Sequence, residues 1–137
     1  MRPRSAISVG AFLVWTIFVW GIVRVRNIMG DADLSTPERT WPLILAATLW
    51  VPAAVLLVTL LVTLLRKRPF AQAATIGVAV LGVWTTLVWI VRAFDIALVS
   101  NRELPFIAVH LVLAVISVAL AVIAARSLRP ELQSNVL

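Results

Sequence analysis

Two Thr-Trp-Arg series could carry chemistry in an otherwise apolar chain. Their members are three or four residues apart, so on a helix each series shares one face. The series are Thr16, Trp20 and Arg24, and Thr85, Trp89 and Arg92. The common role of such residues is an aromatic belt beside an Arg that reaches the membrane surface. The alternative is a pair of sites in which each Arg binds a lipid phosphate and Trp packs beside it.

The single histidine, His110, is a second candidate, because ionisable groups inside a membrane are costly. It could bind haem, relay protons with Asp95, or form a hydrogen bond to a neighbouring helix. Haem held between helices needs a second ligand, and Met1 and Met29 are poorly placed for that role. We therefore expect His110 to form a bond between helices.

Other polar residues have ordinary explanations. Asp31 and Asp33 could form a weak oxygen site for a metal, but Asp also commonly caps helices. Arg92 and Asp95 are three residues apart, which predicts an ion pair at a helix end. Cysteine is absent from the sequence, and so are phosphate-binding loops and catalytic triads. We predict no enzyme activity, no cofactor and no metal.

Membrane-spanning helices must position these residues. Hydrophobic residues make up 62% of the 137-residue chain, and the mean hydropathy is +1.05. A soluble domain of this size could not bury so much apolar surface, whereas runs of about 20 apolar residues fit a bilayer. The sequence predicts an all-α membrane protein with four transmembrane helices. The spans are 6–25, 41–65, 71–92 and 104–125.

Charged residues predict the orientation of these spans. With four spans, both termini and the 66–68 loop share one side, which carries seven Lys and Arg against five on the other. The positive-inside rule then places both termini in the cytoplasm, with the chain in the cell inner membrane. The basic residues flank apolar runs, so we expect no nucleic-acid binding. Ser35 and Glu38 predict a capping box, and Pro52 predicts a bend in the second span.

The sequence also contains a self-match. Residues 14–20 and 83–89 agree at five of seven positions, and the match continues after a one-residue gap into residues 22–24 and 90–92. We interpret it as an internal repeat of two tandem helix hairpins, 1–69 and 70–137. Pro42 and Pro105 then open the second helix of each hairpin. Repeats with an even number of spans have parallel topology and a pseudo-twofold axis along the membrane normal.

The second half resembles a family of small two-helix membrane proteins from actinobacteria. The resemblance rests on Gly82, Val83, Trp84, Trp89, Phe94, Asp95, the Phe-x-x-Val-His segment 106–110 and Ser117. It covers about half of the chain and implies a Trp-rich first helix, a polar loop and a second helix. It implies no activity. The first half has Ala47 near the place of His110.

These observations favour a non-catalytic accessory, scaffolding or regulatory subunit of a larger membrane complex. Its partners would be the lipid bilayer and other integral membrane proteins or a second copy. The alternative is a small homo-oligomeric transporter or channel for an apolar or lipid-like substrate. Its polar lining would come from Thr48, Thr59, Thr63, Thr85, Thr86, Ser117 and His110.

Overall fold

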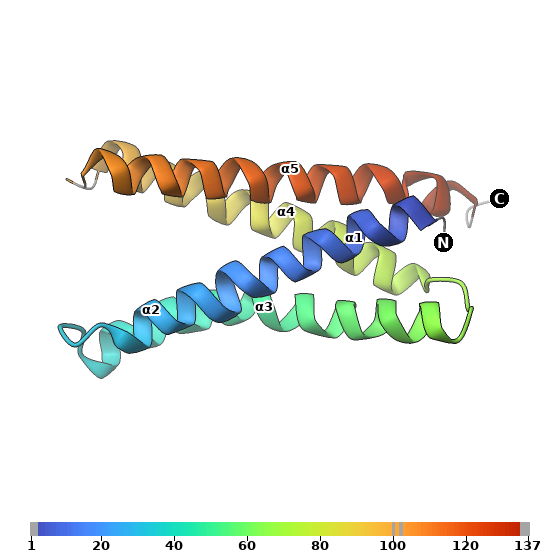
Figure 1. Ribbon diagram of the computed structural model, residues 1–137, viewed down its shortest axis with the longest axis horizontal. Helices are drawn as coiled ribbons and strands as arrows, with labels where there is room; N and C mark the ends of the chain where they lie inside the picture. Colours follow the sequence, from blue (N-terminus) through green and yellow to red (C-terminus); the bar gives the residue numbers. More distant parts are fainter. Residues whose placement is uncertain (1–2, 100, 102, 135–137) are drawn as a thin grey trace.

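The computed structural model describes residues 3–99, 101 and 103–134, with side chains as far as Pro130 (Figure 1). Within these residues the chain forms four long helices and no strand. Each is long and apolar enough to cross a membrane, which confirms the predicted all-α membrane protein. The first comprises α1 (Pro3–Thr16), η1 (Ile17–Arg24) and α2 (Val25–Gly30); then come α3 (Thr36–Leu65), α4 (Gln72–Phe94) with η2 (Asp95–Val99), and α5 (Leu104–Ser134).

The helices extend beyond the apolar runs that predicted them. The first continues to Gly30 and the third to Val99, so Arg24 and Arg92 lie within helices rather than at their ends. A helix that continues past the hydrocarbon keeps its backbone groups hydrogen-bonded, which favours the longer form. The segments η1 and η2 are π-helical, a wider form in which one extra residue is accommodated.

The predicted start of α3 is confirmed. The Glu38 carboxylate accepts hydrogen bonds from the Ser35 backbone N–H at 2.8 Å and from the Ser35 hydroxyl at 2.6 Å. This contact satisfies a backbone donor at a helix start, where no intrahelical partner exists. Further along, α3 runs unbroken through Pro52. The bend expected there stays a prediction.

Figure 1 shows α1 and α4 crossing between α5 on one side and α3 on the other. Helix α1 packs on both α5 and α3, and α4 does the same. Both termini and the turn between α3 and α4 lie at one end of the molecule, whereas α2 and η2 end at the other. Every helix therefore runs antiparallel to the helix that follows it.

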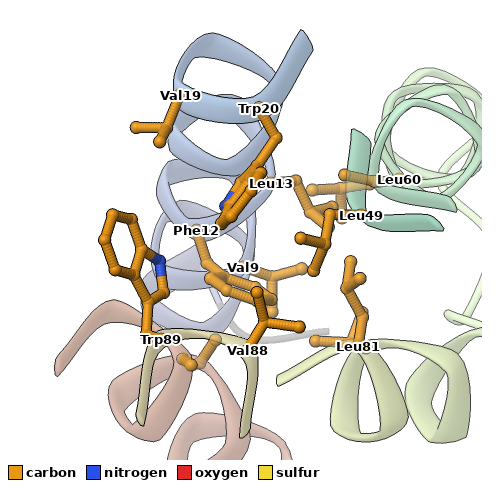
Figure 2. Close-up of a cluster of buried hydrophobic side chains, with 14 of the residues drawn as sticks. Val9, Phe12, Leu13, Val19, Trp20, Leu49, Leu60, Leu81, Val88 and Trp89 are labelled. Carbon is orange, nitrogen blue, oxygen red and sulfur yellow. The ribbon is translucent and has the colours of Figure 1, made fainter. Parts of the chain in front are cut away.

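Large side chains fill the space where the helices cross. Figure 2 shows Phe12, Leu13 and Trp20 from the first helix facing Leu49 of α3 and Trp89 of α4, all of them buried. The outer surface is apolar as well. In the most apolar 18-residue stretch of α5 the mean hydropathy is 2.9, yet only 17% of the residues are buried. Exposed apolar residues on this scale indicate a lipid environment, so the chain is a multi-pass membrane protein.

Candidate functional site

Two buried tryptophans meet where the first helix faces α4. The rings of Trp20 and Trp89 are edge to face, with centroids 5.5 Å apart and an interplanar angle of 61°. Each is 3% exposed, and neither indole N–H has a hydrogen-bond partner in the described part of the chain. Figure 2 shows the two nitrogens on the sides of the rings that face each other. A buried donor without a partner is costly, so these two N–H groups mark a site that lacks an acceptor.

Beside this pair lies a small cavity of about 50 Å³, which we call the arginine pocket. Side chains from the first helix, α4 and α5 line it: Val19, Trp20, Val23, Arg24, Asn27, Trp89, Arg92, His110 and Leu113. Five of the candidates chosen from sequence therefore converge on one cavity: Trp20, Arg24, Trp89, Arg92 and His110. Two separate Trp-Arg sites were the alternative to an aromatic belt in the sequence analysis; the crossing of the first helix and α4 brings both Trp-Arg pairs to one cavity.

The arginine pocket is rich in donors and positive charge. Arg24 and Arg92 are each half-buried, and their guanidinium groups repel each other. No carboxylate lines the cavity, and within the described part of the chain neither guanidinium forms an ion pair. A site of this kind can accept an anion or a ligand with several oxygen acceptors.

The predicted ion pair between Arg92 and Asp95 is wrong for this structure. Among the described residues the exposed Asp95 side chain forms no ion pair, and it does not line the pocket. Asp95 begins the π-helical η2.

His110 forms its hydrogen bond within its own helix. Its Nδ1 lies 2.9 Å from the Phe106 carbonyl oxygen, and the centroids of the His110 and Phe106 rings are 4.0 Å apart. Because a carbonyl only accepts, Nδ1 carries the proton and Nε2 is left free to bind. No hydrogen bond joins His110 to Asp95 or to another helix in the described residues. The expected bond between helices is therefore not formed.

The two threonines of the series lie deeper in the core. Thr16 and Thr85 are each 1% exposed and do not line the arginine pocket. The Thr16 hydroxyl donates to the Phe12 carbonyl at 2.8 Å, whereas the Thr85 hydroxyl has no partner among the described residues.

Two hydrogen bonds between helices were not predicted from the sequence. The Trp15 indole N–H donates to the Ser117 hydroxyl of α5 at 2.9 Å. The Trp84 indole N–H donates to the Thr48 hydroxyl of α3 at 3.0 Å. Both tryptophans belong to the self-match, so the repeated motif was the available signal. The partners could not be identified without knowing which helices pack together.

Three of the six hydroxyls proposed to line a channel bond to their own helices. Thr48, Thr59 and Thr86 donate to the carbonyl oxygens of Leu45, Val55 and Gly82 at 2.7, 2.9 and 2.8 Å, respectively. Threonine hydroxyls commonly satisfy themselves in this way in apolar helices. These groups therefore offer little to a polar substrate.

The loop carboxylates also have a structural role. The Asp31 carboxylate accepts from the Asp33 backbone N–H at 3.1 Å, as in a turn stabilised by an aspartate side chain. Among the described residues, no three His, Cys, Asp or Glu side chains lie close enough together to hold a metal.

Comparison with protein-family models, with curated proteins and with solved structures found no match.

Proposed function

We propose that this protein is a non-catalytic accessory subunit of a larger complex in the cell inner membrane. It would bind an apolar transmembrane helix of its partner in a groove between α3 and α4. The observation that carries this proposal is a difference between two matching helix contacts: the α1–α5 contact is closed, and the α3–α4 contact is open. The comparison rests on an internal duplication of the chain.

The hydrogen bonds of Trp15 and Trp84 support the duplication. In each bond a tryptophan from the first helix of one hairpin donates to the second helix of the other hairpin. The two donors, Trp15 and Trp84, are 69 positions apart, and so are the two acceptors, Thr48 and Ser117. The first and third helices, Pro3–Gly30 and Gln72–Val99, also have the same length of 28 residues. A pseudo-twofold axis between Trp20 and Trp89 would produce this pattern.

The one-residue gap in the self-match also has a structural counterpart. Gly21 is the additional residue in the first half, and it lies inside the π-helical η1. A π-helical turn takes up an inserted residue without rotating the helix on either side. Arg24 and Arg92 therefore reach the same pocket despite the gap. The 69-residue shift also makes Trp41, rather than Ala47, the counterpart of His110, and it does not pair Pro42 with Pro105.

The α1–α5 contact is closed. Ser117 is 2% exposed where it accepts from Trp15, and the Ser5 hydroxyl adds a second bond by donating to the Ser127 carbonyl at 3.0 Å. This side of the molecule needs no further partner.

The matching α3–α4 contact is open. Trp84 is 38% exposed, and a cavity of about 500 Å³ lies between the two helices. We call this cavity the α3–α4 groove; it is lined by Thr48, Val51, Pro52, Val55, Leu56, Gly77, Val80, Leu81 and Trp84. The same face of α4 continues into a smaller hollow against α5, lined partly by Ala79, Gly82, Ala121 and Ala125.

A transmembrane helix is the occupant that fits this face. Helices associate in lipid through close packing against small residues, since the hydrophobic effect gives little between apolar helices there. The face is almost entirely apolar and runs along α4 from Gly77 to Leu87, about three helical turns. Its few hydroxyls are already bonded to their own helices, so it offers little to a charged or strongly polar ligand.

Photocrosslinking in cells tests this proposal. A photoactivatable amino acid at position 80 lies in the α3–α4 groove, where Val80 is 62% exposed, and one at position 115 lies on α5, where Val115 is 68% exposed. We expect position 80 to give one discrete product with a larger membrane protein and position 115 to give none. Mass spectrometry then identifies the partner.

The other outcomes count against the proposal. A product with the mass of two copies of this chain would make the homo-oligomeric transporter the better hypothesis, and flux assays in liposomes would follow. Products with lipid alone at both positions would mean that the groove is an ordinary lipid-facing surface.

A further inference from the structure

We infer that the arginine pocket is a binding site for a phosphate group, built jointly by both halves of the chain. This inference does not depend on the proposed partner helix, because the pocket lies between the first helix, α4 and α5 rather than in the α3–α4 groove. Three observations carry it: the unpartnered donors, the unpaired charges and the position of the pocket in the molecule.

The unpartnered donors are the indole N–H groups of Trp20 and Trp89. Both residues line the arginine pocket and are 97% buried, and their nitrogens lie on the sides of the rings that face each other. Leaving two buried donors unsatisfied is unfavourable unless an acceptor occupies the site. Aromatic packing alone does not explain this arrangement, because Phe could fill the same space without a donor.

The unpaired charges are those of Arg24 and Arg92. Two half-buried guanidinium groups that repel each other, with no carboxylate in the cavity, destabilise an empty site. An anion between the two guanidinium groups would attract both of them and offset their repulsion. Each guanidinium can donate two parallel hydrogen bonds to neighbouring oxygens, which matches the oxygens of a phosphate group.

The position of the pocket also fits a phosphate. Arg24 lies six residues before Gly30, the end of the first helix, a rise of roughly 9 Å. Head groups occupy roughly 5–7 Å at each surface of a bilayer, and a long Arg side chain at this depth can extend to reach them. At about 50 Å³ the cavity can hold a phosphate group but not a whole lipid molecule. The ligand is therefore a phosphate, either of an anionic phospholipid or of a small soluble compound.

Ligand-dependent stability tests the inference and distinguishes the two sources. The probes are phosphatidylglycerol against phosphatidylcholine, and inorganic phosphate against chloride at equal ionic strength, each added to delipidated protein in a neutral detergent. A lipid site predicts a higher Tm and one retained lipid per chain in native mass spectrometry with phosphatidylglycerol alone. A site for a soluble phosphate predicts a higher Tm with inorganic phosphate as well. No response to either probe overturns the inference.

Matched variants separate a built site from general attraction to negative charge. Arg24→Gln and Arg26→Gln remove the same charge two positions apart, but Arg26 is exposed and does not line the pocket. We expect Arg24→Gln to weaken binding of the active probe at least tenfold and Arg26→Gln less than twofold. Equal losses in both variants would overturn the inference.

The double variant Trp20→Phe with Trp89→Phe tests the donors without changing the charge. It keeps both aromatic rings and removes both N–H groups, so we expect a several-fold loss of binding with unchanged helix content by circular dichroism. Full binding by this variant would show that the tryptophans only pack, and would overturn their assignment as ligand donors.

Discussion

At the scale of single residues, the two like charges in the arginine pocket destabilise the ligand-free protein and favour binding of an anion. Arg24 is half-buried and lines the arginine pocket together with Arg92, and no carboxylate lines the cavity. In delipidated detergent solution we expect Arg24→Gln to raise the Tm by a few degrees, because it removes an unfavourable interaction from the empty site. Arg26→Gln, whose side chain is exposed, should leave the Tm unchanged. A lower Tm for Arg24→Gln would mean that the guanidinium stabilises the fold without a ligand.

A second effect of single residues concerns the bond between Trp15 and Ser117. Replacing Ser117 with Ala leaves the indole N–H without an acceptor in an apolar contact. We expect a loss of about 0.6 kcal/mol, and at most about 1.7 kcal/mol, in the free energy of unfolding, the average and the maximum measured for hydrogen bonds between membrane helices. Ser8→Ala is the control, because the Ser8 hydroxyl donates to the Arg4 carbonyl of its own helix. Equal effects in both variants would argue against a stabilising bond between α1 and α5.

At the scale of elements, η1 should tolerate the loss of one residue. Deleting Gly21 would convert η1 into regular α-helix and leave α1 and α2 facing as before. We expect this variant to purify as a folded, monodisperse, helical protein. Deleting Gly10 from the regular helix α1 would instead rotate the two parts by about 100° relative to each other and separate Val9 from the core face of Phe12. Similar yields from both deletions would contradict the role given to η1.

The number of helices could be predicted from the sequence, because bilayer thickness and apolar runs determine how many helices form. The capping box at Ser35 could also be predicted, because the interaction is local. The arginine pocket could not, because it depends on which helices cross. Nor could the π-helical η2, because the sequence gives no sign that the α-helix ends at Phe94.

At the scale of the whole molecule, the even number of helices places both termini and the α3–α4 turn at one end. The arginine pocket lies toward the opposite end, where α2 and η2 finish. The positive-inside rule assigns the end with the termini to the cytoplasm, so the pocket would face the outer leaflet. A phospholipid bound there would come from that leaflet.

Cysteine labelling tests this orientation cleanly, because the sequence contains no cysteine. Ala32→Cys lies in the turn after α2 and Ala71→Cys in the turn before α4; both alanines are exposed, and neither change alters the charges that set topology. With a membrane-impermeant thiol reagent, we expect intact spheroplasts to label Ala32→Cys and to label Ala71→Cys only after permeabilisation. The reverse pattern would place the arginine pocket at the cytoplasmic surface, and a phosphate bound there would come from the inner leaflet or the cytosol.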